Sequence, residues 1–174
     1  MQTEANKPGP AWWLRTILIG RKPGFTFIRI VVLVVTTFVV FRFVLLPPVR
    51  IKGPSMLPTL RENSIHFVNR LAYFWHEPRR GDVVSIRLAG YRIMYMKRIV
   101  GLPGETIEFS NGRLLVNGEV LEEPYVKSPY RWDLAPRTLG PDEYFVVGDN
   151  RVMPIEDHDM GVATRDRIVG KMLL

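Results

Sequence analysis

A single long apolar stretch near the N-terminus dominates the pattern of hydrophobic and polar residues. From Phe25 to Leu46 nearly every residue is apolar. As a helix rising about 1.5 Å per residue, this stretch is about 33 Å long, close to the hydrocarbon core of a bilayer. Its two charges, Arg29 and Arg42, lie near the ends, where long side chains reach lipid headgroups. We predict one transmembrane helix over residues 25–46; a buried core helix and a cleaved signal sequence are the alternatives.

After Pro47 and Pro48, which end a helix because proline lacks the amide donor, the pattern changes to short runs rich in β-branched residues. The predicted strands cover residues 65–68, 82–88, 92–100, 106–109, 113–116, 144–147 and 168–173. Asn111-Gly112 and Asn117-Gly118 lie between such runs and suit tight hairpin turns. We predict a mostly β fold: an antiparallel β domain (residues 47–174) on one N-terminal transmembrane helix (25–46), preceded by a tail (1–24).

The charge distribution favours a membrane over a nucleic acid as partner. The formal net charge is +7, and +4 of it lies before Ile30, beside the apolar segment. Cations in this position attract anionic headgroups. By the positive-inside rule they also favour a cytoplasmic N-terminus. The chain has no cysteine, which excludes disulfides, thiol nucleophiles and iron–sulfur clusters. Its three histidines lack zinc-ligand spacing, so we predict no metal and no cofactor.

The first segment with chemical content is Gly53-Pro54-Ser55-Met56-Leu57-Pro58. Proline fixes φ and glycine permits close approach of another chain, so this segment can present the Ser55 hydroxyl on a stiff, open loop. A surface turn is the alternative, since serine is common in turns.

The second segment surrounds Lys97, which falls within an apolar predicted strand. Alternation places Lys97 on the face of Tyr95 and Ile99, with Met96 and Arg98 opposite. The unperturbed lysine pKa of about 10.4 must fall by several units for the amine to act as a base at neutral pH, which requires burial. The alternative is a lysine whose ammonium reaches solvent from a half-exposed strand. A third segment, Gly148-Asp149-Asn150-Arg151, follows a predicted strand and suits a polar turn.

Together these segments resemble bacterial type I signal peptidases. The Ser55 segment is similar to that family's nucleophile box and the Lys97 segment to its general-base box. Arg80-Gly81-Asp82-Val83-Val84 resembles the strand-entry box between them, and the segment from Gly148 opens the last box. The four motifs occur in the family's order.

The resemblance implies a membrane-bound serine endopeptidase that removes signal peptides from exported preproteins. It implies that Ser55 attacks the scissile carbonyl while neutral Lys97 accepts its proton, forming an acyl-enzyme that water hydrolyses. The residues expected to form the oxyanion hole or bind substrate are Gly53, Pro54, Met56, Asp82, Val83, Val84, Ser85, Tyr95 and Met96. The residues expected to support the site are Asp149, Asn150, Arg151 and Glu156. The partners implied are signal peptides, cut after small side chains, and the lipid bilayer, with the enzyme monomeric in the cytoplasmic membrane and its catalytic domain outside.

Two departures from the family pattern concern the surroundings of the dyad. Gly53 stands where many members carry a serine as second oxyanion donor. Pro154 stands where a serine hydroxyl orients the base, and Glu156 takes the acidic position. A carboxylate or a water is then needed to replace the hydroxyl at Pro154.

The short distance along the chain between the apolar segment and Ser55 independently indicates that Ser55 acts close to a membrane surface. Ser55 follows the apolar segment by about eight residues, a reach of at most about 30 Å. Residues 71–75 include aromatic side chains suited either to headgroups or to core packing.

Three other readings remain open. Ser55 can pair with His158 and one of Asp149, Asp157 or Asp159 as a different serine hydrolase. The chain can be a peptidase dedicated to one substrate, such as a pilin. It can also be a degenerate relative that binds extended peptides by strand addition.

Overall fold

The computed structural model describes residues 23–87, 94–127, 130–152, 154–158 and 160–174. The chain divides into two units after Val44. Trp12 and Trp13, considered as interfacial residues, lie outside the described residues.

The first described element is an apolar helix. Helix α2 (Pro23–Val40) continues into a π-helical turn, η1 (Phe41–Leu45). Residues Phe25–Leu45 are long and apolar enough to cross a membrane, and Phe27, Val34 and Phe38 are 70%, 59% and 63% exposed. An isolated water-soluble helix rarely exposes large apolar side chains all round, whereas a lipid-facing helix does.

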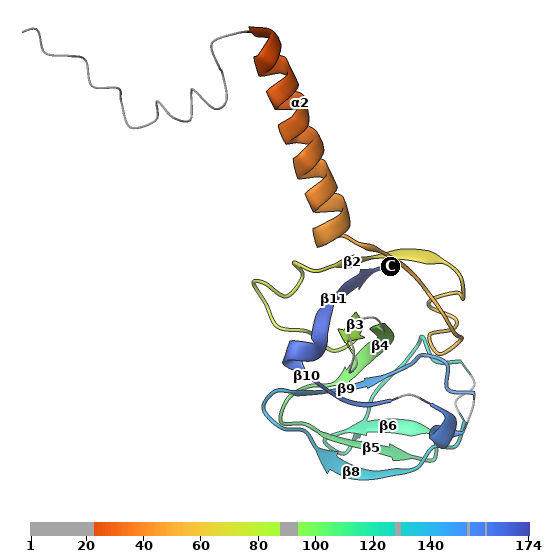
Figure 1. The fold of residues 1–174 in the computed structure, drawn as a ribbon. Coiled ribbons are helices and arrows are strands. Elements are labelled where there is room, and N and C mark those ends of the chain that lie inside the picture. Colours follow the sequence, from red (N-terminus) through yellow and green to blue (C-terminus); the bar gives the residue numbers. More distant parts are fainter. Residues whose placement is uncertain (1–22, 88–93, 128–129, 153, 159) are drawn as a thin grey trace, which may run out of the picture. The chain divides into compact units, whose positions relative to one another are not determined.

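The second unit, Leu45–Leu174, contains two antiparallel sheets. The larger sheet has seven strands in the order β1-β2-β11-β3-β4-β9-β10. Its strands are β1 (Pro48–Arg50), β2 (Ile65–Asn69), β3 (Val83–Arg87), β4 (Met94–Gly101), β9 (Glu143–Val147), β10 (Gly161–Thr164) and β11 (Ile168–Leu173). The smaller sheet has the order β7-β6-β5-β8, from β5 (Thr106–Ser110), β6 (Arg113–Val116), β7 (Glu119–Val120) and β8 (Leu134–Thr138). Every described strand pair is antiparallel, and Figure 1 shows the smaller sheet lying below β9. This confirms the predicted mostly β, antiparallel fold class.

Both predicted Asn-Gly turns form hairpins. Asn111 and Gly112, between β5 and β6, have φ of 50° and 79°. Asn117 and Gly118, between β6 and β7, have φ of 52° and 83°. These left-handed values favour asparagine and glycine, so the two dipeptides set the register of the smaller sheet.

Apolar clusters hold the sheets together. One cluster joins Val100, Phe145 and Val147 of the larger sheet to Ile107 and Phe109 of the smaller one. A second buries one face of β3, β4 and β9, and a third packs β2, β3 and β11 against the segment that carries Ser55. The third cluster is the one that positions the candidate site.

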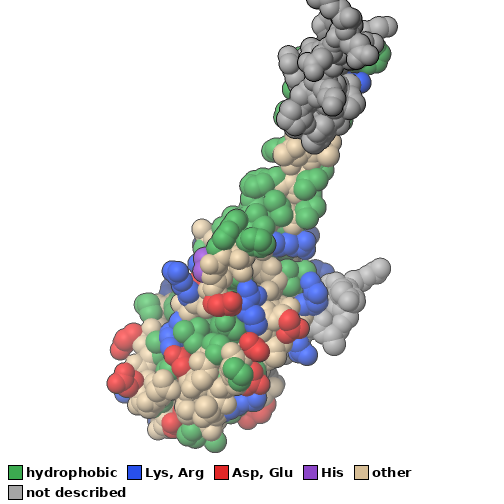
Figure 2. Space-filling view, turned by 90° about the vertical axis from the view of Figure 1, so that its left-hand side faces the viewer, with side chains coloured by type: hydrophobic (Ala, Val, Ile, Leu, Met, Phe, Trp, Pro, Cys, Tyr) green, Lys and Arg blue, Asp and Glu red, His purple; other side chains and the backbone are tan. Residues whose placement is uncertain are grey.

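The surfaces of the two units differ in kind. Figure 2 shows apolar side chains along the visible face of α2, whereas charges of both signs are spread over the β unit. Within the β unit, Phe74 and Trp75 are 73% and 78% exposed and lie edge to face, with ring centroids 4.9 Å apart.

Candidate functional site

The Ser55 loop is anchored in the core on one side and open on the other. Met56 and Leu60 are buried in the third apolar cluster, and Leu60 N–H donates to the Met56 carbonyl at 2.9 Å. Pro54 is exposed and Ser55 half-buried. Gly53 has φ of 84°, a left-handed value that favours glycine. The loop therefore holds Ser55 at the surface on buried supports, as the sequence pattern predicts.

The turn after β9 binds this loop from the other side. Asn150 N–H donates to the Ser55 carbonyl at 3.0 Å, and Asn150 Nδ2 donates to the Pro54 carbonyl at 3.1 Å. A Cβ atom at Gly148 would lie 2.2 Å from the Ser55 carbonyl oxygen. Only glycine at position 148 allows this approach, because real Cβ atoms do not come so close to an oxygen.

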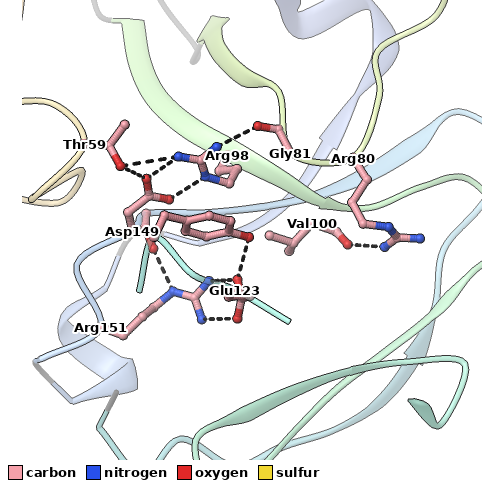
Figure 3. A network of polar contacts seen from close by, with 10 residues as sticks. Thr59, Arg80, Gly81, Arg98, Val100, Glu123, Asp149 and Arg151 are labelled. Atoms are coloured by element: carbon pink, nitrogen blue, oxygen red, sulfur yellow. Dashed lines mark hydrogen bonds and ion pairs between the residues drawn. The ribbon is translucent and has the colours of Figure 1, made fainter. Parts of the chain in front are cut away.

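A buried ion pair fixes the turn to β4. Asp149 accepts hydrogen bonds from Arg98 Nε at 2.8 Å and from a terminal Arg98 nitrogen at 2.6 Å, and it also accepts from the Thr59 hydroxyl (Figure 3). Arg98 donates to the Gly81 carbonyl at 2.7 Å. Burial opposes the charge of Arg98, but the bonds to Asp149 outweigh it and raise the arginine pKa. Thr59 belongs to the Ser55 loop, so this pair connects three segments.

A second arginine supports the same turn from behind. Arg151, only 1% exposed, donates to the Gly148 carbonyl and to Glu123, each at 2.7 Å (Figure 3). The Tyr125 hydroxyl donates to Glu123 at 2.9 Å, and the ring of Tyr125 lies under Arg98, 3.9 Å from its guanidinium carbon. Burial, followed by the charge of Glu123, raises the pKa of Tyr125 and keeps it a neutral donor. Through these contacts Asp149, Asn150 and Arg151 hold the turn and the Ser55 loop together.

Lys97 lies in the middle of β4 and is 3% exposed. It lines a cavity of about 220 Å³ with Tyr95, Ile86, Val146 and Ala163, among others. Its Nζ atom lies 6.0 Å from the centre of the Tyr95 ring. Met96 packs into the third cluster and Arg98 reaches Asp149, so the two faces of β4 divide as alternation predicts.

The sheet register brings Lys97 and the Ser55 loop to the same place. Arg98 is opposite Val147 in the β4–β9 pair, so the next position sets Lys97 beside Gly148. Gly148 is the residue on which the Ser55 carbonyl packs. The register, continued by one residue, therefore places the backbone of Lys97 and the carbonyl of Ser55 on either side of the same glycine.

The predicted substrate residues of β3 are buried and paired on both sides. Val83, Val84 and Ser85 are 2%, 0% and 0% exposed, and β3 is bonded to both β4 and β11. Ser85 donates to the Met94 sulfur at 3.2 Å.

Asp82, at the start of β3, is held by three donors. Lys171 Nζ reaches it at 2.6 Å, the Tyr73 hydroxyl at 3.0 Å and Arg79 N–H at 3.1 Å. Burial raises the pKa of this carboxyl, but the bonds from Lys171, Arg79 and Tyr73 outweigh it, and the pKa is lowered. Asp82 therefore ties the end of β3 to β11.

The segment after Arg151 differs from the rest of the site. Glu156 is exposed, in the 3-10 turn η2 (Ile155–Asp157), and Pro154 precedes that turn. His158 is 6% exposed and packs edge-on against Trp132, with ring centroids 4.8 Å apart. Its Cε1 and Nε2 atoms each lie 2.9 Å from the position of a Cβ at Gly148, so His158 and Ser55 both border this glycine.

Several residues of the site were not singled out by the sequence. Arg98, Thr59, Glu123 and Tyr125 form the support network, and Arg167 lines the cavity of Lys97. The sequence could have pointed to Arg98, because it is a second charge in an apolar strand, on the face opposite Lys97. A buried charge of this kind needs a buried partner.

Comparison with known proteins adds the following similarities. The family model described as signal peptidase, peptidase S26, matches residues 25–174. Signal peptidase I of Leptolyngbya laminosa is 35% identical over 132 residues, covering 71% of this chain and 65% of that protein, slightly less than two thirds. Signal peptidase I T of Bacillus subtilis (strain 168) is 33% identical over 153 residues, covering 82% of this chain and 79% of the relative. A crystal structure of a signal peptidase I from Enterococcus faecalis is 26% identical, covers 56% of this chain and 97% of that chain, and has a TM-score of 0.46.

Proposed function

The chain belongs to the signal peptidase family, peptidase S26, and from this premise we propose that it is a serine endopeptidase that removes signal peptides from exported preproteins. The observation that supports the proposal is that the Ser55 carbonyl oxygen packs on Gly148, the residue that the β4–β9 register, continued by one position, sets beside Lys97. Support also comes from relatives named signal peptidase I over most of this chain.

In the proposed mechanism, Ser55 Oγ attacks the carbonyl carbon of the scissile peptide bond and Lys97 Nζ takes the hydroxyl proton. The leaving amine then takes that proton, and water hydrolyses the Ser55 ester with Lys97 again as base. Lys97 is 3% exposed among apolar side chains, which removes the water that stabilises an ammonium ion. This burial supports a neutral amine as the resting form.

The oxyanion of the tetrahedral intermediate needs donors close to Ser55. We assign the backbone N–H of Ser55 as one donor. The residue two positions earlier is Gly53, which has no hydroxyl to offer; no heavy atom lies within 4 Å of where its Cβ would be, so the space beside it is open to substrate. In this proposal Gly53 leaves the space beside Ser55 open, and the second donor is a group other than a side chain at position 53.

The free edge of β4 is the proposed docking place for the substrate strand. Among the described strands, β9 pairs with β4 only from Arg98 onwards and Gly148 follows beside Lys97, so residues 94–96 keep one edge without a partner strand. An extended peptide added there would run past Tyr95 and Met96 to Lys97. β3 offers no such edge, so Asp82, Val83, Val84 and Ser85 shape the site from beneath the peptide rather than pairing with it.

We further propose that residues 25–46 anchor the enzyme in the cytoplasmic membrane, with residues 1–24 inside and residues 47–174 outside. The apolar exposed surface of α2 and the cations before it support this arrangement. The chain has no cysteine, so Gln2→Cys and Glu122→Cys each give one thiol. In intact cells, a membrane-impermeant maleimide should label the Glu122→Cys variant and leave the Gln2→Cys variant unlabelled. The opposite result, with label on the Gln2→Cys variant alone, would reverse the orientation.

The test of the function is cleavage of a preprotein by the full chain in detergent micelles. Wild type should release a mature protein whose new N-terminus follows a small residue, whereas Ser55→Ala and Lys97→Met should release none. Arg137→Gln, an exposed change on β8, should cleave as wild type does. Thermal unfolding of each variant shows that it is folded. Cleavage by folded Ser55→Ala at the wild-type rate would refute the proposal.

A further inference from the structure

The cavity beside Lys97 has one exposed cation in its wall. Arg167 belongs to the 3-10 turn η3 (Arg165–Arg167) that follows β10, and it lines the same cavity as Tyr95 and Lys97. Apart from these three, the described residues that line the cavity are apolar, and none of these described residues is a carboxylate. Any charged group that enters this cavity therefore meets positive charge.

Neighbouring cations form ion pairs, whereas Arg167 forms none among the described residues. Arg165 pairs with Glu77 at 2.5 Å and Lys171 with Asp82 at 2.6 Å. Within the described part of the chain, Arg167 has no carboxylate oxygen within 4.0 Å. The adjacent carboxylate, Asp166, accepts a hydrogen bond from the Thr164 hydroxyl at 2.5 Å, and this bond together with the charge of Arg167 lowers its pKa. Asp166 does not line the cavity, so its charge only partly offsets that of Arg167 there.

This arrangement gives a physical reason for the charge of one substrate side chain to matter. A peptide on the free edge of β4 points alternate side chains to the Lys97 face. A lysine or arginine there is repelled by Arg167. An aspartate or glutamate pairs with Arg167, which also keeps that carboxylate from favouring the charged form of Lys97.

We propose that Arg167 is a specificity-determining residue that makes the enzyme prefer an acidic over a basic side chain at the substrate position facing this cavity. The inference rests on the proposed cleavage of preproteins at Ser55.

The experiment uses a set of preproteins that differ at one position. Each of the four residues before the cut is varied in turn to Asp, Ala or Lys, and kcat/KM is measured with the full chain in detergent. For wild type we expect Asp to exceed Lys by about fivefold to tenfold at one position, in line with exposed charge pairs. In Arg167→Gln this ratio should fall to about one, and in Arg167→Glu it should invert.

Two controls separate a local from a general effect. Arg137→Gln removes the same charge from β8 and should keep the wild-type ratio. In 1 M salt, where screening acts within about 3 Å, the wild-type ratio should shrink without any substitution. If wild type cleaves the Ala substrates but shows no charge preference, or if Arg167→Gln keeps it, the inference is overturned while the proposed function stands. Failure of wild type to cleave any substrate would instead remove the proposed function.

Discussion

The Ser55 carbonyl oxygen lies 2.2 Å from the point where a Cβ atom at Gly148 would be. The backbone of the turn after β9 therefore contacts the backbone of the Ser55 loop. The hydrogen bond from Asn150 N–H to the Ser55 carbonyl, at 3.0 Å, holds the two segments together. The same glycine follows Val147, the register partner of Arg98, so under the proposed mechanism its missing side chain governs how near the Ser55 hydroxyl can come to the Lys97 amine.

Gly148→Ala should therefore push the Ser55 loop away and lower kcat of preprotein cleavage by about 100-fold, the usual effect of a misplacement of about 1 Å. Steady-state kinetics check this, with KM expected to change less than kcat. Gly140→Ala is the matched control, because the nearest atoms to its Cβ would be those of the Glu143 side chain, at the ordinary contact distance of 3.5 Å. A Gly148→Ala enzyme with normal kcat would contradict the proposed role of this contact.

Removing one partner of the Arg98–Asp149 pair should unfold the site. Asp149 is 0% exposed, and Asp149→Asn or Arg98→Leu leaves a buried charge without its counter-ion. Each single change should lower the free energy of unfolding by about 3–5 kcal/mol. Denaturant unfolding measures this.

The matched control for the ion pair is the exposed Arg137, 3.9 Å from Glu143. Arg137→Gln should cost about 0–1 kcal/mol. The double change at Arg98 and Asp149 should cost less than the sum of the singles, since the two residues act together. If the losses in the free energy of unfolding from the two single changes simply add in the double change, Arg98 and Asp149 do not interact.

Sequence patterns predicted the central strands of this fold but not its edges. The strands that were not predicted are β1, β7, β8 and β10, which are the outer strands of the two sheets. Their side chains are partly solvated, so the alternation of apolar and polar residues is weak. β8 also contains Pro136, which an edge strand tolerates but which in the sequence indicates the end of a strand. Central strands such as β4 are buried and carry a clear apolar signal.

The same contrast holds for the site. Ser55 and Lys97 could be named because their motifs are local, and the burial of Lys97 followed from an apolar strand. The partner of Arg98 could not be predicted, because the contact between Arg98 and Asp149 spans 51 positions and depends on the β4–β9 register. The exposed position of Glu156 and the place of His158 beside Gly148 likewise depend on the tertiary path of the chain.

Asp82 should make stability depend on pH in the acid range. Its pKa in the folded chain is below the ordinary value of 3.8, so its contribution is present above that value and is lost as pH falls through the folded pKa. Asp82→Asn should therefore destabilise the chain near pH 7, by about 1–3 kcal/mol, and by progressively less below about pH 4. Denaturant unfolding from pH 7 to pH 2.5 checks this.

The exposed Glu119 provides the comparison. Glu119→Gln should change stability little at any pH. A cost of Asp82→Asn that stays constant down to pH 2.5 would show that the Asp82 carboxylate is not the source.

The role of His158 can be separated from that of Lys97. Both border Gly148, but Asp149, one candidate to orient the histidine, is already bonded to Arg98 and Thr59. We expect Lys97→Met to abolish preprotein cleavage, whereas His158→Ala should lower it by about tenfold or less, through lost packing on Trp132. An inactive, folded His158→Ala beside an active Lys97→Met would instead favour the histidine as base.

Acylation of Ser55 tests the central claim, that Lys97 acts as a neutral base towards this hydroxyl. The full chain in detergent is treated with a serine-directed acylating inhibitor, and the mass added to the Ser55 peptide is followed with time between pH 5 and pH 10. The account predicts a wild-type rate that rises with pH to a plateau, no adduct in Ser55→Ala, and a rate in folded Lys97→Met that falls by at least about 100-fold. Equal labelling of Ser55 in wild type and Lys97→Met across this range would contradict it.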